Sequence, residues 1–265
     1  MKFSIIVVCL NPGDKLFETI ETIQSQTYKN YEVVVKDGMS TDGSVDKLPA
    51  DEHIRVFKEK DKSIYDAMNQ AVKYATGDYY FFLNCGDLFY SDTVLEEVAG
   101  FIEEKEKQGE KCDIVYGNTY EQKTGTVVTS TPKINGFSCY RNVPCHQTCF
   151  YASDMFKERA YLPEYRVRGD YEHFLYCFYK LKASISSMPI VISYYEGGGF
   201  SESKANRKRS KREHKEIVRI YMTFMERFRY KTILLLTLAP LRKKIAESKS
   251  MSGVYNKLKS YLYHR

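Results

Sequence analysis

The fold is decided by three apolar runs that each end in turn-forming and acidic residues: SIIVVCLNPGD at 4–14, YEVVVKDGMSTDGS at 31–44 and YYFFLNCGDLF at 79–89. In parallel α/β sheets the carboxyl ends of the strands share one edge, where ligands bind. Asp37 closes the second run, and Asp87 follows the third. Between them, the segment DKSIYDAMNQ supplies Lys62, Asp66 and Asn69. Such a cluster suits a metal-bound diphosphate.

Segments with helical periodicity lie between these runs. Apolar residues recur at helical spacing in 16–23 and in 64–75, the second time after a strand predicted near 54–57. The strands predicted at 3–9, 31–36 and 79–83 lack strict alternation, which is typical of strands that are buried on both faces. The pattern predicts an α/β fold with a doubly wound, mostly parallel sheet covered by helices.

The second half of the chain is less regular. It predicts a charged helix up to about residue 107, a strand at 113–116 and a hairpin around 123–125. A helix at 171–182 and a strand at 190–195 follow. The next stretch, GGGFSESKANRKRSKR at 197–212, is rich in glycine and polar residues, so we expect a mobile loop there.

Charge divides the chain in two. The 265 residues carry a net charge of +6, but residues 204–265 hold 18 Lys and Arg against 4 Asp and Glu. Residues 1–203 hold 22 basic residues against 30 acidic ones. We therefore expect one main domain at 1–203 and a basic helical extension at 204–265, with different partners.

The cellular compartment is predicted from the cysteines and the first apolar run. Seven scattered cysteines make a disulfide framework improbable, which favours a reducing cytoplasm. The run at 4–10 is short and leads into a turn without a small-residue cleavage site, so it is interpreted as a buried strand and not as a signal peptide.

The basic extension contains the apolar run TILLLTLAPL at 232–241, which is shorter than the roughly 20 residues needed to span a bilayer. One hypothesis is that it lies on an anionic membrane surface, flanked by basic residues. A second is a helix packed on the main domain with a solvated basic face. Nucleic-acid binding is not expected, because no recognised motif accompanies the charge.

The two acids at the strand ends each allow two interpretations. Asp37 could accept hydrogen bonds from a base or a ribose, or it could close an Asx turn. Asp87 could bind Mg²⁺ or Mn²⁺ together with a diphosphate, or it could stabilise the turn that follows it. Gly86 would allow the backbone to approach a ligand closely.

Five motifs in a fixed order carry a resemblance to a known family: CLNP, KDGMSTDGS, DKSIYDAMNQA, FLNCGD and RGDYEHFL. Over roughly residues 3–200 the chain resembles glycosyltransferase family 2, the inverting enzymes of GT-A fold. It looks most like the bacterial members that build capsule, O-antigen or exopolysaccharide. The resemblance implies a Rossmann-like nucleotide-diphospho-sugar transferase fold.

The resemblance also implies roles for individual residues. Asp37 would contact the nucleotide base, usually uracil, with Asn11 in the same pocket, and Asp87 would be the ligand of Mn²⁺ or Mg²⁺. Asp66 and Asn69 are expected to belong to the nucleotide-sugar site. The chain departs from the family's Asp-x-Asp pattern at 85–87, where Gly86 replaces an acid.

A second departure concerns the phosphate contact. Many relatives have an arginine where this chain has Met68, so Lys62 is the substitute candidate for binding phosphate.

The family's acidic motif makes Asp170 the expected catalytic base, with Glu172 as its rival. Helical spacing places Asp170 on the apolar face of the following helix and directs Glu172 elsewhere. Asp170 could also be an ordinary N-cap. As the base, it would take a proton from an acceptor hydroxyl that attacks the anomeric carbon opposite the leaving nucleotide, and the configuration would invert.

His146 and Gln147 are interpreted as polar groups of the active site or of the acceptor side, because similar pairs occur in related family members. A satisfied core histidine is the alternative. Zinc binding by Cys145, His146 and Cys149 is disfavoured, because a structural zinc site needs four ligands. The segment GGGFS at 197–201 could close over the donor sugar.

The sequence therefore predicts a metal-dependent hexosyl- or N-acetylhexosaminyltransferase at the cytoplasmic face of a membrane. Its donor would be a nucleotide-diphosphate sugar, expected to be a UDP-sugar, and its acceptor a hydroxyl of a lipid-linked or growing glycan. The alternative is a catalytically inactive, membrane-attached nucleotide-binding module, suggested by Gly86 and Met68. The sugar, the linkage and the oligomeric state are not fixed by these patterns.

Overall fold

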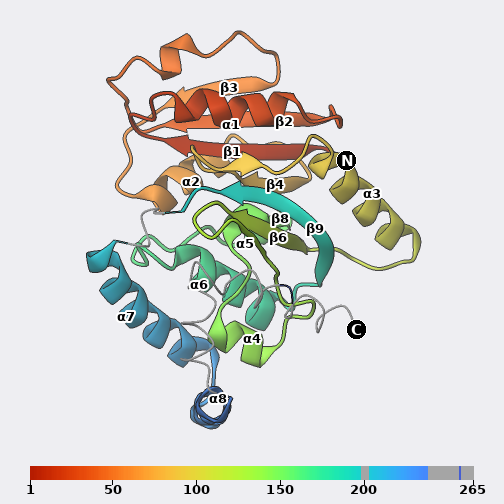
Figure 1. Cartoon of the computed structure of the whole chain (residues 1–265), viewed down its shortest axis with the longest axis vertical. Coiled ribbons are helices and arrows are strands. Elements are labelled where there is room, and N and C mark those ends of the chain that lie inside the picture. The colour runs from red at the N-terminus through yellow and green to blue at the C-terminus, as the bar shows by residue number, and fades with distance from the viewer. Residues whose placement is uncertain (198–202, 238–256, 258–265) are drawn as a thin grey trace.

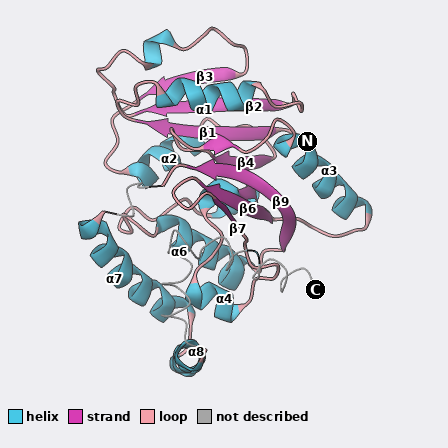
Figure 2. Cartoon of the chain, in the orientation of Figure 1, coloured by secondary structure: helices cyan, strands magenta, loops and turns pink. Residues whose placement is uncertain are grey.

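The computed structural model describes residues 1–197, 203–237 and 257, and nine strands of these residues form one sheet. Helices cover both faces of the sheet, as Figure 1 and Figure 2 show. The strand order is β3-β2-β1-β4-β8-β6-β9-β5, with β7 paired to β6. The predicted fold class is confirmed.

The amino-terminal half contains the four parallel strands that the apolar runs predict. Its elements are β1 (Phe3–Cys9), α1 (Lys15–Gln24), β2 (Tyr31–Asp37), a 3₁₀ turn (Val45–Lys47), β3 (Ile54–Lys58), α2 (Ile64–Val72) and β4 (Tyr79–Phe82). Strand β1 pairs with β2 and β4, and β2 pairs with β3, all in parallel. Cys9 lies opposite Asp37, so both strands end at the same edge.

The carboxyl-terminal half is mixed in direction. Its first elements are β5 (Leu88–Phe89), α3 (Val94–Lys107), β6 (Ile114–Glu121), β7 (Thr126–Val128), α4 (Gly136–Arg141) and a 3₁₀ turn (His146–Thr148). The remaining elements are β8 (Cys149–Ala152), α5 (Asp154–Glu158), α6 (Gly169–Tyr176) with a π-helical turn (Cys177–Leu181), β9 (Ile185–Tyr195), α7 (Lys204–Tyr221) and α8 (Phe224–Leu236). Strand β8 runs antiparallel to both β4 and β6, whereas β9 runs parallel to β6.

Burial on both faces explains the unbroken apolar character of β1. Phe3, Ile5 and Val7 belong to a core cluster shared with α1 and α3, whereas Ile6 and Val8 belong to the cluster shared with α2, α6 and α7. Successive side chains of a strand point to opposite faces. A strand between two helical layers must therefore be apolar at every position.

Helix α7 contradicts the loop that we expected across 197–212. It begins at Lys204, after the N-cap Ser203, whose hydroxyl accepts a hydrogen bond from the Asn206 N–H at 3.2 Å. The expectation was wrong for 204–212 because lysine and arginine are good helix formers, and the sequence has no glycine or proline there. Of the lid expected at 197–201, residues 198–201 lie outside the described residues.

Helix α7 is packed into the domain. Ile217, Val218 and Met222 are buried in the core cluster that α6 also joins. Glu213 is only 3% exposed and accepts hydrogen bonds from the backbone N–H groups of residues 166, 167 and 168 at 3.2, 3.0 and 2.9 Å. This carboxylate fixes the segment that leads into α6. None of the helices in the described part of the chain is long and apolar enough to cross a membrane.

Candidate active site

Two loops meet where β1 and β2 end. The Asn11 side chain accepts a hydrogen bond from the Thr41 N–H at 2.8 Å, and the Asn11 N–H donates to the Ser40 hydroxyl at 2.8 Å. The Ser40 N–H and hydroxyl both donate to Asp37 Oδ1, at 3.0 and 2.5 Å. Asp37 is fully buried, so its carboxylate closes the turn that our second interpretation described. The structure thus brings Asn11 and Asp37 together.

The backbone is strained at the same edge. Asn11 and Met39 have φ values of 48° and 72°, a region that residues other than glycine seldom adopt. Two apolar side chains at this edge are open to solvent: Leu10 is 61% exposed and Met39 is 55% exposed. Strained residues gather at ligand sites more often than elsewhere. The sequence patterns gave no indication of Leu10 or Met39 as candidates.

A second group of residues links β4 to α6 through His146. The Asn84 amide nitrogen lies 2.8 Å from His146 Nε2, and His146 Nδ1 lies 3.2 Å from Asp170 Oδ2. The other carboxylate oxygen of Asp170 accepts hydrogen bonds from the Tyr65 hydroxyl and the Tyr171 N–H, both at 2.8 Å. Residues from four distant parts of the chain therefore form one connected network.

The network controls the charge of its members. Burial by itself would raise the pKa of Asp170, but hydrogen bonds from His146, Tyr65 and the Tyr171 N–H outweigh it and lower that pKa. Burial would lower the pKa of His146, yet its hydrogen bond to Asp170 and the charges of Asp170 and Asp87 raise it. Asp170 is therefore held as a carboxylate.

Asp87 lies next to this network in a different environment. It is 9% exposed, and burial raises the pKa of its carboxyl group to about 6, although the charges of His146 and Lys15 act in the opposite direction. Its backbone is fixed, because the Asp87 carbonyl accepts a hydrogen bond from the Thr19 hydroxyl at 3.0 Å. Among the described residues, no hydrogen bond reaches the carboxylate of Asp87.

These groups fit a divalent ion that is carried by a diphosphate. Asn84 Oδ1 is buried and, among the described residues, also lacks a hydrogen-bond partner, so this loop offers an amide oxygen and a carboxylate group that are both unsatisfied. Within the described ranges, no group of three or more His, Cys, Asp or Glu could hold a metal by itself. Mg²⁺ and Mn²⁺ commonly use one or two carboxylates and complete their coordination with phosphate and water. Asp87 is the residue that would hold such an ion.

The two candidate bases, Asp170 and Glu172, have different hydrogen-bond partners. Glu172 is 1% exposed and accepts two hydrogen bonds from Arg159 Nη2, at 3.1 and 2.8 Å, and a third from the Tyr221 hydroxyl. It ties α6 to α7, away from Asn84 and His146. Asp170 alone of the two acids joins the network at the strand ends.

The remaining candidates have mostly local contacts. The Asn69 side chain donates a hydrogen bond to the Tyr161 carbonyl at 2.8 Å and accepts one from the Tyr161 N–H at 2.9 Å. Asp66 accepts a hydrogen bond from the Lys62 N–H at 2.8 Å at the start of α2. The Lys62 side chain is exposed, and no contact to its ammonium group is present in the described part of the chain. Their roles in binding a nucleotide sugar stay predictions.

Sequence reasoning did not identify Tyr65 or Gly169. Gly169 packs so tightly that an added Cβ atom would lie 2.7 Å from Cδ2 of Tyr65. Glycine at this position allows the Tyr65 ring to reach Asp170. A tyrosine on the helix before β4 offers no local pattern that would have indicated this contact.

The four parallel strands, the mixed half and the loops at the strand ends define the GT-A fold of nucleotide-diphospho-sugar transferases. Known structures agree: S. aureus TarS 1-349 in complex with UDP matches with a TM-score of 0.65 at 21% identity, over 88% of this chain and 70% of that chain. At that identity the match shows the fold alone.

The family is shown by sequence. The model of glycosyl transferase family 2 matches residues 4–162, and the chain therefore belongs to this family. A PGL/p-HBAD biosynthesis glycosyltransferase of Mycobacterium tuberculosis is 32% identical over 217 residues, covering 79% of this chain and 83% of the relative. WfaP of Escherichia coli, a UDP-Glc:alpha-D-GlcNAc-diphosphoundecaprenol beta-1,3-glucosyltransferase, is 33% identical over 151 residues, covering 54% of this chain and 57% of WfaP.

Proposed function

We propose that this protein is an inverting glycosyltransferase that moves a hexosyl or N-acetylhexosaminyl group from a UDP-sugar to a hydroxyl of a lipid-linked or growing glycan. The observation that carries the proposal is the hydrogen-bonded connection of Asp170 through His146 to Asn84. It brings the Asp170 carboxylate next to the loop of Asp87, where we expect a diphosphate to bind, and this supports Asp170 as the base. A base at Asp170 and a leaving group at Asp87 would then act on the same bound sugar.

In the proposed reaction, Asp170 accepts the proton of the acceptor hydroxyl as that oxygen attacks the anomeric carbon. The bond from the anomeric carbon to the diphosphate oxygen breaks on the opposite face, so the configuration inverts. Tyr65 and His146 hold the Asp170 carboxylate in one orientation. A lowered pKa keeps Asp170 ionised and ready to accept the proton.

Asp87 would hold Mn²⁺ or Mg²⁺ against the donor diphosphate. The ion would supply positive charge that offsets the charge developing on the leaving nucleotide. His146 is close enough to Asp87 for their charges to interact, so a protonated His146 would add positive charge at the same place. An unpaired carboxylate with a pKa near 6 favours this role, because a cation relieves the cost of its burial.

The nucleotide would bind at the ends of β1 and β2. Asn11 and Asp37 supply polar groups there, and Leu10 and Met39 supply exposed apolar surface for a base. Because Asp37 is buried beneath Ser40, contact with a base requires the 38–42 segment to shift. Lys62 remains the candidate for a phosphate contact.

The relatives support the chosen substrate class. The name of WfaP specifies a UDP-Glc donor and a diphosphoundecaprenol-linked acceptor. TarS is known in complexes with UDP and with UDP-GlcNAc, and a mannosyltransferase from Pyrobaculum calidifontis in complex with GDP-Man and Mn²⁺. Because WfaP shares the family at 33% identity, a UDP-sugar and a lipid-linked glycan are the first substrates to test.

The decisive experiment compares Asp170→Asn with wild type in transfer from a panel of UDP-sugars with Mn²⁺. We expect transfer to fall by a factor of at least about 100, because the amide cannot accept the proton, while UDP binding by calorimetry is retained. Asp154→Asn is the matched control, since Asp154 is exposed and its one ion pair within the described residues is with Lys157 at 3.1 Å.

Two results would contradict the proposal. Retained turnover in Asp170→Asn would show that Asp170 is not the catalytic base. A wild-type protein that binds UDP but transfers and hydrolyses no UDP-sugar would instead be the inactive nucleotide-binding module. Asp87→Asn tests the metal site in both cases, because it should abolish the Mn²⁺ dependence of UDP binding whether or not the protein turns over.

A further inference from the structure

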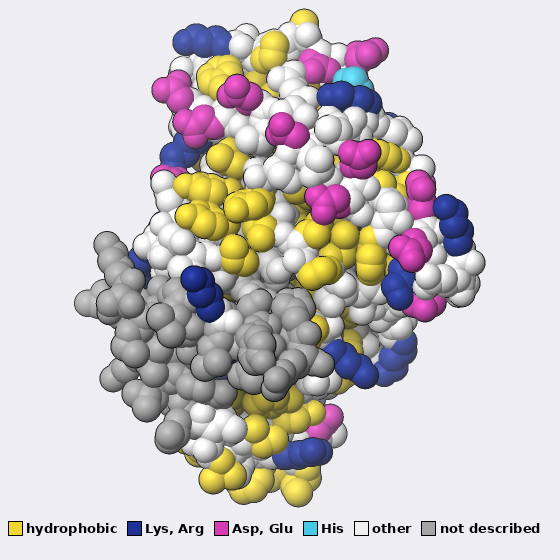
Figure 3. All heavy atoms as spheres, turned by 45° about the vertical axis from the view of Figure 1, so that its right-hand side comes forward, with side chains coloured by type: hydrophobic (Ala, Val, Ile, Leu, Met, Phe, Trp, Pro, Cys, Tyr) yellow, Lys and Arg dark blue, Asp and Glu magenta, His cyan; other side chains and the backbone are white. Residues whose placement is uncertain are grey.

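Helix α8 turns its apolar side outward. Five of its large hydrophobic side chains are 60–78% exposed, and they are Phe224, Met225, Phe228, Leu235 and Leu236. At 3.6 residues per turn these positions fall within about a third of the helix circumference. Figure 3 shows hydrophobic side chains gathered at the lower tip of the molecule, where Figure 1 places α8. A surface helix normally shows the reverse pattern.

The helix is nevertheless well formed and fixed to the domain. Thr223 and Glu226 make a capping box at its start. On its inner side, Tyr230 packs against Tyr140 and Phe137, with ring centroids 5.6 and 5.7 Å apart. The exposed face therefore does not result from a misplaced or unfolded segment, and it is held in a defined direction.

Basic residues border this apolar face. Arg229 and Lys231 are exposed on α8 itself, and Arg219 is exposed in the last turn of α7. Together, residues 204–237 hold 11 Lys and Arg against 3 Glu. All three glutamates are already engaged: Glu213 binds backbone N–H groups, Glu216 accepts a hydrogen bond from the Tyr165 hydroxyl at 3.4 Å, and Glu226 belongs to the capping box. The surroundings of the face are therefore strongly positive.

We propose that the outward face of α8 docks on an anionic lipid bilayer. Apolar side chains enter the interface between headgroups and acyl chains, and the basic border contacts the negatively charged headgroups. A helix lying in the membrane plane needs such an apolar face, but it does not need the length of a spanning helix.

Charge argues against the other occupants of this face. A second copy of the chain would bring a similarly basic border against this one, and like charges would repel. Residues 238–265 hold 7 Lys and Arg against 1 Glu, so they offer the face no complementary charge either. An anionic surface satisfies both the apolar face and its basic border.

The effect of this docking on activity rests on the proposed function. A glycosyltransferase that acts on a lipid-linked acceptor meets its substrate at the membrane surface, so docking through α8 would raise the local concentration of that acceptor. The docking itself requires only the surface chemistry of α8, and it can be measured without turnover.

The test uses the full chain and co-sedimentation with vesicles of phosphatidylcholine, with and without phosphatidylglycerol. Wild type should sediment with the phosphatidylglycerol vesicles and be released by salt. The double variant Phe228→Ser and Leu235→Ser should lower partitioning by about tenfold or more, since both side chains lose their burial in lipid. Val56→Ser is the matched control, because Val56 is 38% exposed on β3, away from α8.

Thermal unfolding verifies the fold of the double variant, whose midpoint should match that of wild type because α8 has no buried residues. Equal sedimentation of the double variant and wild type would overturn the proposal. It would also be overturned if wild type formed a dimer in solution that the double variant dissolves and bound no vesicles. In that case a second copy would cover the face.

An activity assay separates this inference from the proposed function. The double variant should transfer sugar to a soluble acceptor at the wild-type rate and lose transfer to an acceptor embedded in vesicles. If wild type binds vesicles but transfers no sugar to any acceptor, the docking surface stands and the glycosyltransferase assignment fails. If wild type transfers sugar but binds no vesicles, the glycosyltransferase assignment stands and the docking surface fails.

Discussion

At the scale of single residues, the site depends on how one carboxylate is held. Asp170 receives hydrogen bonds from the Tyr65 hydroxyl, from His146 and from the N–H of Tyr171. Each bond favours the ionised form, and together they outweigh the effect of burial. The Tyr65 bond is the one that a single isosteric substitution can remove.

The variant Tyr65→Phe should raise the pKa of Asp170. The acidic limb of the kcat/KM profile should then move to higher pH, because the carboxylate loses a donor that favours its charged form. Tyr161→Phe is a close control: Tyr161 packs on Tyr65 with ring centroids 5.2 Å apart, but its buried hydroxyl has no hydrogen-bond partner in the part of the chain that the structure describes. Profiles of Tyr65→Phe and wild type that coincide would show that Tyr65 does not tune the base.

The sequence predicted some of these residues and could not predict others. Asp170, Asp87 and His146 stand in short local motifs, and helical spacing correctly directed Glu172 away from Asp170. Tyr65 lies 105 positions from Asp170, so only the folded chain brings the two together. Pairing over such distances depends on packing details, which local patterns do not encode.

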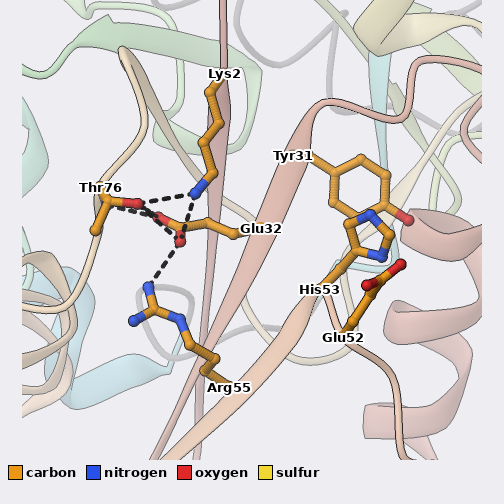
Figure 4. Close-up of a pocket in the computed structure, with 7 residues that line it drawn as sticks. All are labelled: Lys2, Tyr31, Glu32, Glu52, His53, Arg55 and Thr76. Atoms are coloured by element: carbon orange, nitrogen blue, oxygen red, sulfur yellow. Dashed lines mark hydrogen bonds and ion pairs between the residues drawn. The ribbon is translucent and has the colours of Figure 1, made fainter.

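At the scale of elements, the opposite edge of the sheet is held by an ionic hub around the buried Glu32. Glu32, near the start of β2, accepts hydrogen bonds from Ser4 Oγ at 2.6 Å, Lys2 Nζ at 3.1 Å and Arg55 Nη2 at 2.7 Å. Figure 4 shows Lys2, Arg55 and Thr76 converging on Glu32 within a cavity of about 490 Å³. The hub joins β1, β2, β3 and the segment before β4.

This hub makes stability depend on pH. Burial would raise the pKa of Glu32, but hydrogen bonds from Ser4, Thr76 and Lys2 lower it from 4.5 to about 2. Because the folded-state pKa is lowered, the stabilisation is complete above pH 4.5 and is lost as the pH falls toward about 2. Glu32→Gln should cost about 2 kcal/mol at neutral pH and progressively less toward pH 2.

Urea unfolding across that pH range measures this difference. Glu52→Gln is the control, because Glu52 lines the same cavity but is exposed. A constant difference between Glu32→Gln and wild type at every pH would show that the charge of Glu32 has no part in the stabilisation.

Elements with strong periodicity were predicted well, and short ones were not. The residues of β1 lie where the apolar run predicts them, because burial on both faces leaves a continuous apolar signal. Strand β8 has only four residues and lies between a 3₁₀ turn and a short helix, so no period can develop. In α7, polarity concealed only the first turns at 204–212, because the buried apolar residues of this helix lie near its end.

At the scale of the whole molecule, the first part of the basic extension belongs to the folded domain. Helix α7 contributes Ile217 and Val218 to the core, its C-cap residue Met222 is buried with them, and its Glu213 holds residues 166–168. Those residues lead directly to Asp170, so the position of the proposed base depends on a helix that follows it by more than 30 residues. Charge composition divided the chain at Ser203, but packing does not follow that division.

Two truncations test this dependence. A chain that ends at Ser203 loses three buried apolar side chains, worth about 2 kcal/mol each, and leaves the backbone N–H groups of 166–168 without their acceptor. That loss is comparable with the whole stability of an ordinary domain, about 5–15 kcal/mol. We expect this chain to unfold at a much lower urea concentration and to lose UDP binding.

A chain that ends at Met222 keeps α7 and removes α8, which has no buried residues. It should unfold at nearly the wild-type urea concentration and bind UDP with unchanged affinity, while its vesicle binding disappears. Equal unfolding midpoints for the two truncated chains would contradict the structural role of α7. Because both chains lack the same distal residues, the difference between them isolates 204–222, the segment that fixes Asp170 from behind.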